Sequence, residues 1–155
     1  VGKTKNPMKL DLTTGDAITP REIEYTYPCI FSQEDIKIMA YPLETILAEK
    51  YETIIRRNIT TTRMWDFYDL YTLYKLKKDE IDYKVLKEAI ERTSKKRESQ
   101  EIMKDYKEIS EDIKEDSYLR SLWDVYLNEN KYIGDLYFDK VVDVVTIISN
   151  RINEM

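Results

Sequence analysis

The segment that decides the fold spans residues 36–57 and reads IKIMAYPLETILAEKYETIIRR. Its first five residues place Ile36, Ile38 and Ala40 on one face, a period of two that predicts a β-strand. After Pro42 the apolar residues recur every three or four positions, which predicts an α-helix beginning at this proline. The members of this helical stripe are Leu43, Ile46, Leu47, Tyr51, Ile54 and Ile55. The change of period therefore predicts that strands come before helices.

Two further strands are expected upstream of this segment. Apolar side chains alternate with polar ones in two stretches, and Thr14-Gly15-Asp16 between them is typical of a turn. The alternating residues are Met8, Leu10 and Leu12 in the first stretch and Ile23, Tyr25 and Tyr27 in the second. We therefore expect about three short strands within residues 1–41 and a helical region over residues 42–155.

About six helices are expected in the helical region, which makes the predicted fold class α+β. One should run from Arg63 to about Lys77, with apolar residues on two faces, as is typical of a buried helix. Residues 141–148 are rich in β-branched side chains that would also suit a strand, but polar residues at spacings of three and four favour a helix. Residues 93–99 are expected to form a charged connector between the third and fourth helices, solvated rather than bound to phosphate; its cations are Lys95, Lys96 and Arg97.

Composition excludes several chemistries. The 155 residues contain no histidine and one cysteine, Cys29, so they support neither His-dependent triad chemistry nor a cysteine-rich zinc site. Any metal would be a hard ion on carboxylates, most simply Mg²⁺. The net charge of −5 gives no global field that attracts nucleic acid. No apolar run approaches the ~18 residues of a membrane helix, so we expect a cytoplasmic protein without a membrane partner.

Lys50 interrupts the apolar stripe of its helix. It lies seven residues after Leu43 and four before Ile54, so its side chain should emerge between apolar neighbours. A buried ammonium group is unfavourable unless it is paired or used in binding. The ordinary alternative is a lysine at the edge of the stripe that extends its ammonium to water. Spacing alone leaves both interpretations open.

Three aspartates are further candidates. Asp66 and Asp69 share one face of the second helix, where they would require a cation, a metal ion or helix N-terminal amides, although acids in the first turns of a helix are common without any function. Pairing of one of them with Lys50 would account for both anomalies. Asp11 lies on the polar face of its strand, and the pattern alone favours an ordinary solvent-facing residue. Most of the thirteen tyrosines fall on apolar faces, and packing is the expected role of both tryptophans, Trp65 and Trp123.

Three segments of the chain resemble, in order and with matching spacing, segments of the AbiEii/AbiGii toxin family. They are LDLTTGDAITP at residues 10–20, AYPLETILAEK at residues 40–50 and RMWDFYDLY at residues 63–71. This family is similar to the DNA polymerase β-like nucleotidyltransferases, which bind a nucleoside triphosphate and magnesium on a small sheet. Its members act in toxin–antitoxin and abortive-infection phage-defence systems of bacteria, and some transfer a nucleotide to tRNA.

The resemblance implies roles for individual residues. Asp11 matches a carboxylate that holds magnesium and helps to activate the acceptor hydroxyl. Lys50 matches a helix lysine expected near the triphosphate, and Asp66 a catalytic aspartate beside it. Arg63 and Asp69 match residues expected to help bind the nucleotide. The implied ligands are Mg²⁺, a nucleoside triphosphate and an acceptor such as tRNA.

One departure from the family pattern is large. The Gly-Ser motif and the Asp-x-Asp pair expected upstream of Asp11 do not occur in these 155 residues. Two-metal phosphoryl transfer needs carboxylates for both ions, so we expect this C-terminal portion to be inactive by itself. The alternative is a non-catalytic helical module that binds an antitoxin or another protein. Exposed sheet edges would also make self-association a candidate property.

Overall fold

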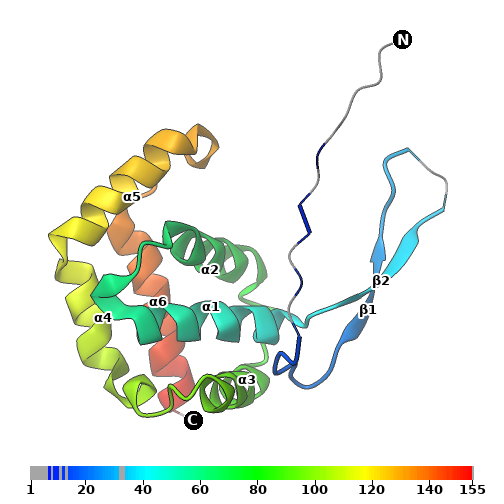
Figure 1. Ribbon diagram of the computed structural model, residues 1–155, viewed down its shortest axis with the longest axis horizontal. Coiled ribbons are helices and arrows are strands. Elements are labelled where there is room, and N and C mark those ends of the chain that lie inside the picture. Colours follow the sequence, from blue (N-terminus) through cyan, green and yellow to red (C-terminus); the bar gives the residue numbers. More distant parts are fainter. Residues whose placement is uncertain (1–6, 8, 11, 13, 32–33, 155) are drawn as a thin grey trace.

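The structure, a computed structural model, describes residues 7, 9–10, 12, 14–31 and 34–154. In this part of the chain two strands precede six α-helices, so the predicted α+β class is confirmed (Figure 1). Three short 3-10 helices, η1 to η3, connect some of the α-helices. The bounds are β1 Ile23–Tyr27, β2 Ile36–Ala40, α1 Leu43–Arg57, η1 Asn58–Thr60, α2 Met64–Lys77, α3 Tyr83–Lys96, η2 Ile102–Asp105, α4 Tyr106–Glu115, α5 Ser117–Glu129, η3 Lys131–Ile133 and α6 Phe138–Asn153.

The two strands form an antiparallel hairpin in which Tyr25 lies opposite Ile38. The prediction of about three strands was wrong by one for the described residues. Met8 and Asp11 of the predicted first strand lie outside the described residues, and Leu10 and Leu12 belong to no strand. Both leucines are largely exposed. Among the described residues, neither leucine has the hydrogen-bonded neighbouring strand or the packed face that stabilises a strand in water.

Helix α1 lies at the centre of the helical region, between α2 and α3 (Figure 1). The carbonyl of Pro42 accepts the first helical hydrogen bond from Ile46, as expected for a helix that begins at a proline. The apolar side chains of α1 are buried on more than one side of the helix, and they include Leu47, Ala48, Tyr51, Ile54 and Ile55. Helix α1 is thus enclosed on more than one side, and its buried residues also include the polar Thr45, Glu52 and Thr53.

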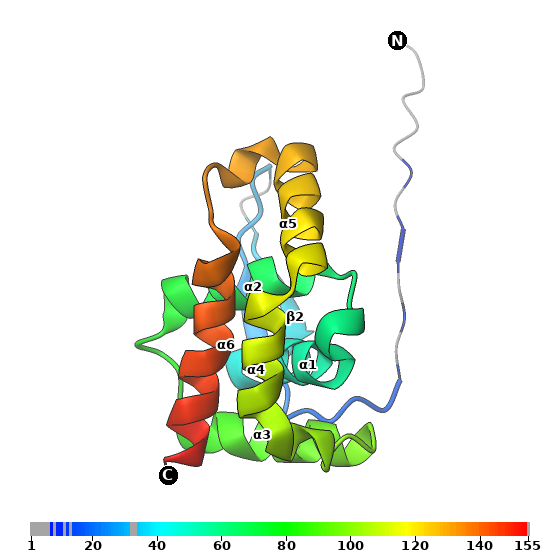
Figure 2. The same cartoon turned by 90° about the vertical axis from the view of Figure 1, so that its left-hand side faces the viewer.

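Helix α6 confirms the helical prediction for residues 141–148. Its β-branched side chains fill the core against α2 and α4, and α4 and α5 follow one another beside it (Figure 2). The Tyr51 hydroxyl on α1 and the Ser149 hydroxyl on α6 share a 2.7 Å hydrogen bond inside this core. At 16 residues α6 is the longest helix of the described residues, and none of these helices is long and apolar enough to cross a membrane.

Helix α2 is less buried than its two apolar faces predicted. Phe67 and Leu70 are fully buried against the core, whereas Leu76 near the C-terminal end is largely exposed. The outer face of α2 thus remains open to solvent along part of its length.

Trp123 on α5 is buried, and its indole donates a 2.7 Å hydrogen bond to the Leu136 carbonyl, so its predicted packing role is confirmed.

Candidate functional site

The ammonium group of Lys50 pairs with both candidate aspartates of α2. Its Nζ atom lies 2.9 Å from Asp66 Oδ1 and 2.8 Å from Asp69 Oδ2, and it donates a hydrogen bond to each. The pairing predicted from the interrupted apolar stripes is therefore confirmed as a contact. The Lys50 side chain keeps 24% of its surface exposed, so it is neither sealed in the core nor free in water.

Asp66 is the buried member of this cluster. It lies in the first turn of α2, where the helix dipole favours a carboxylate. Its Oδ2 atom is 2.7 Å from Arg63 Nε, but the angles do not allow a hydrogen bond, and both atoms lack a hydrogen-bond partner among the described residues. Asp66 is thus held between two cations with one oxygen incompletely satisfied. We call Lys50, Arg63, Asp66 and Asp69 the lysine cluster.

Asp69 forms the open side of the lysine cluster. Its side chain is 42% exposed, against 2% for that of Asp66. Burial opposes the charge of Lys50, but the hydrogen bonds that its ammonium group donates to the two aspartates outweigh this effect and raise the pKa of Lys50 above its usual value. Lys50 therefore remains a full positive charge at neutral pH.

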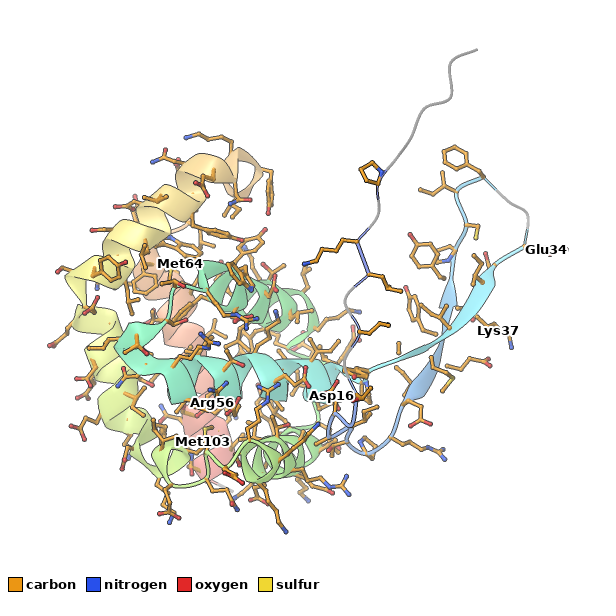
Figure 3. All side chains as sticks on the ribbon, viewed as in Figure 1. Asp16, Glu34, Lys37, Arg56, Met64 and Met103 are labelled. Atoms are coloured by element: carbon orange, nitrogen blue, oxygen red, sulfur yellow. The ribbon has the colours of Figure 1, made fainter. Side chains whose placement is uncertain are left out.

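Residues 14–19 are anchored beside the start of α1. The buried Thr19 donates its N–H to Thr45 Oγ1 at 2.9 Å, and the Thr45 hydroxyl donates back to the Thr19 carbonyl at 3.0 Å. Tyr41 donates a 2.8 Å hydrogen bond to Asp16, which lies where this segment meets α1 (Figure 3). Lys96 of α3 donates to the carbonyl of Gly15, which adopts a φ of +74°. The predicted turn is thus fixed to two helices.

The predicted metal ligand, Asp11, lies outside the described residues. Within the part of the chain that the structure describes, no group of three or more His, Cys, Asp or Glu side chains could hold a metal ion. The acids of the lysine cluster are occupied by Lys50 and Arg63, so they do not form such a group either. Magnesium binding through Asp11 remains a prediction.

A second ionic network, which the sequence analysis missed, lies on another side of α1. Glu52 is completely buried and accepts hydrogen bonds on both carboxylate oxygens. Arg56 Nε lies 2.8 Å and the Ser99 hydroxyl 2.7 Å from Oε1, and Arg97 Nη1 lies 2.6 Å from Oε2. Figure 3 shows Arg56 on the side of α1 that faces η2. We call Glu52, Arg56, Arg97 and Ser99 the glutamate network.

Arg97 corrects the prediction of a solvated connector. Its Nη1 atom also donates to Thr53 Oγ1 at 3.0 Å, so the side chain joins the end of α3 to α1. The next residue, Glu98, has a φ of +55°, a left-handed conformation that ends α3. The chain direction after α3 therefore places Arg97 against Glu52. Lys95 and Lys96 are exposed, but they belong to α3 and not to a connector, and Lys96 contacts Gly15 and Asp16.

Trp65 also departs from its predicted packing role. The side chain is 46% exposed, and the Arg63 guanidinium lies over its ring at 5.3 Å from the centroid. An exposed indole next to the lysine cluster adds an aromatic surface that periodicity could not reveal, because α2 has apolar residues on more than one face. The site is therefore larger than the four charged residues.

Comparison with known families assigns the class of protein to which this fold and site belong. A family model described as "Nucleotidyl transferase AbiEii toxin, Type IV TA system" matches residues 1–144, which is nearly the whole chain. The class is thus that of nucleotidyltransferase toxins from toxin–antitoxin systems, and the chain belongs to the AbiEii family. Searches among curated proteins and among solved structures found no match.

Proposed function

We propose that this chain binds the triphosphate of a nucleoside triphosphate through Lys50 during nucleotidyl transfer. Membership of the AbiEii family supports the reaction class. The observation that carries the assignment is the lysine cluster, because a half-exposed aspartate covers a lysine that is held protonated beside a buried aspartate. A purely structural ion pair has no need of such an opening.

Each member of the lysine cluster has a defined part in this proposal. Lys50 meets the phosphates as a point charge. Asp66 orients the ammonium group and keeps it protonated between substrates. Asp69 occupies the position of the phosphate in the absence of substrate and turns to solvent when the phosphate arrives. Arg63 supplies a second positive charge at the other carboxylate oxygen of Asp66.

We propose that the chain consists of a sheet-forming part, residues 1–41, and a helical part, residues 42–155. Asp11 belongs to the first part, where a metal-bound carboxylate would help to activate the acceptor hydroxyl. Neither a Gly-Ser pair nor an Asp-x-Asp pair occurs in the sequence. We therefore propose that the 155 residues alone transfer no nucleotide, and that a protein containing these motifs as well transfers a nucleotide to an RNA acceptor such as tRNA.

The test is a transfer assay with Mg²⁺, labelled nucleoside triphosphates and tRNA. The 155-residue chain should label nothing, whereas a longer protein that adds the two motifs should label an RNA. In the longer protein Asp11→Asn should abolish labelling, and Asp124→Asn, a change at an exposed aspartate of α5, should leave it unaltered. Efficient transfer by the 155 residues would contradict the proposed need for the missing carboxylates.

One observation favours the alternative of a protein-binding module. The hairpin presents an apolar face made by Ile23, Tyr25, Tyr27, Ile36 and Ile38, all of them exposed. The opposite face carries Glu24, Thr26, Lys37 and Met39, and contains the Glu24–Lys37 ion pair at 2.8 Å. An exposed apolar face of this kind suits a protein partner such as an antitoxin. Replacing Tyr25 with Lys should then weaken antitoxin binding without altering nucleotide binding at Lys50.

A further inference from the structure

Aromatic rings lie at both ends of the lysine cluster. At one end the Arg63 guanidinium lies on the Trp65 ring while its Nε atom contacts Asp66 at 2.7 Å. Asp66 contacts Lys50, and Lys50 contacts Asp69 at 2.8 Å. The contacts therefore run without a break from an exposed indole, through three charged side chains, to Asp69.

Three tyrosines continue this row beyond Asp69. Tyr68 is the residue before Asp69 on α2, and burial, followed by the neighbouring Tyr132 and the Asp69 charge, raises the pKa of the nearby Tyr126 to about 12. The Tyr126 ring lies 6.2 Å from the Tyr68 ring, and Tyr68 meets Tyr132 edge-on at 6.3 Å. Tyr132, on η3, is 75% exposed. The row ends, as it began, in a ring that faces solvent.

The two terminal rings do not serve the core. Trp123 and Tyr51 are fully buried and fill that role. A single exposed aromatic residue is ordinary on a protein surface. Two such rings at the ends of one row of neighbouring side chains, with cations between them, match the pattern by which proteins bind unpaired bases. Neither ring is in an enclosed cavity, so the row suits an extended strand better than a single small molecule.

We propose that this row binds the single-stranded end of a nucleic-acid acceptor, with bases stacked on Trp65 and Tyr132. The inference rests on the proposed function, since Lys50 holds the triphosphate next to the bound strand. Arg63 faces the backbone phosphate between the stacked bases. A duplex does not bind in this way, because its bases are already stacked and paired. The net charge of −5 leaves stacking as the main source of affinity.

Direct binding measurements test the proposal. Fluorescence anisotropy of a labelled short single-stranded RNA should show that Trp65→Ala and Tyr132→Ala each weaken binding by about fivefold or more. Tyr137→Ala is the matched control, because Tyr137 is also 75% exposed but lies outside the row, and it should leave the affinity unchanged. Tyr132→Phe should retain binding, because stacking depends on the ring and not on the hydroxyl.

A spectroscopic measurement makes the test independent of folding. Trp65 is the exposed one of the two tryptophans, so RNA should quench the intrinsic fluorescence of the wild-type chain and not that of Trp65→Phe. Binding should fall only slightly with added salt, since about one phosphate is neutralised. A steep loss with salt, equal binding of a duplex, or equal affinity of all alanine variants would overturn the proposal.

Nucleotide binding, measured separately on the same variants, distinguishes this inference from the proposed function. Tyr132→Ala should bind a nucleoside triphosphate as the wild type does, whereas Lys50→Ala should not. Triphosphate binding without any RNA binding would refute the stacking row and leave the proposed function standing. Failure of the wild-type chain to bind either ligand would refute both.

Discussion

Helix α1 contributes Lys50 to the lysine cluster and Glu52 to the glutamate network, and these two ionic clusters are built differently. Each encloses a buried carboxylate between two cations, Asp66 in the lysine cluster and Glu52 in the glutamate network. Both oxygens of Glu52 accept good hydrogen bonds, and Ser99 completes the set. In the lysine cluster Asp66 Oδ2 lacks such a bond, and the exposed Asp69 forms one boundary.

This difference in hydrogen bonding and exposure leads us to expect a structural role for the glutamate network and a binding role for the lysine cluster. A satisfied, fully buried carboxylate is expected to join helices, here α1 and the end of α3. A cluster with an exposed counter-ion, and with one carboxylate oxygen that makes an ion pair but no hydrogen bond, stabilises the fold less than it could, and such partly exposed charge clusters are candidates for functional sites. The glutamate network should therefore respond to mutation mainly in stability, and the lysine cluster mainly in binding.

The largest expected effect on folding is at Glu52. Glu52→Ala removes the centre of the glutamate network and should lower the free energy of unfolding by about 3 kcal/mol, as for other broken buried ion pairs. Denaturant unfolding measures it, with Glu49→Ala as a control, because Glu49 lies 3.7 Å from Arg97 and is partly exposed. A loss below about 1 kcal/mol for Glu52→Ala would make the two clusters equivalent in stability.

A smaller effect is expected at Tyr51, which lies between Lys50 and Glu52 on α1. Burial raises the pKa of its hydroxyl from 10.0 to about 12, so the folded state favours the protonated form. This contribution to stability is fully present below pH 10 and is lost as the pH rises through 12, for a total of about 2–3 kcal/mol. Unfolding free energies should fall more steeply between pH 9.5 and 12 for the wild type than for Tyr51→Phe. Parallel curves of unfolding free energy against pH for the two proteins would contradict the burial of the Tyr51 hydroxyl.

The smallest change in stability is expected at Asp69. Because its side chain is 42% exposed, Asp69→Asn should alter the free energy of unfolding by no more than about 1 kcal/mol. The substitution removes the competing negative charge at Lys50, so triphosphate binding should become tighter or remain unchanged. Calorimetric titration with a nucleoside triphosphate provides the measurement. Loss of binding would show that Asp69 contributes directly to the bound state and is not displaced from it.

The sequence predicted those features that depend on local periodicity. The hairpin strands, the helix at Pro42 and the helical character of residues 141–148 all follow from spacing. The contact of Lys50 with Asp66 was predictable because each side chain interrupts an apolar stripe. Family membership was predictable from three short segments, and the family match confirms it.

The features that the sequence did not predict depend on contacts between distant residues or on which of several apolar helix faces is packed. Glu52 lies four residues after Ala48 and three before Ile55, so its position in the stripe was a signal equal to that of Lys50. Its partner Arg97 is 45 residues away, and the contact depends on how α3 ends. The exposure of Trp65 could not be predicted, since α2 offers several apolar faces and only packing selects among them.

The measurement that tests the account most directly combines activity and melting for one variant, Lys50→Ala, in a toxin that contains this chain. We expect toxicity and triphosphate binding to be abolished while the Tm changes by only a few degrees, because Arg63 still neutralises Asp66 and Asp69 can turn to water. The contrary result is a sharp fall in Tm, as for a structural ion pair worth ~3–5 kcal/mol, with toxicity per folded molecule unchanged. That outcome would make the lysine cluster a second structural network.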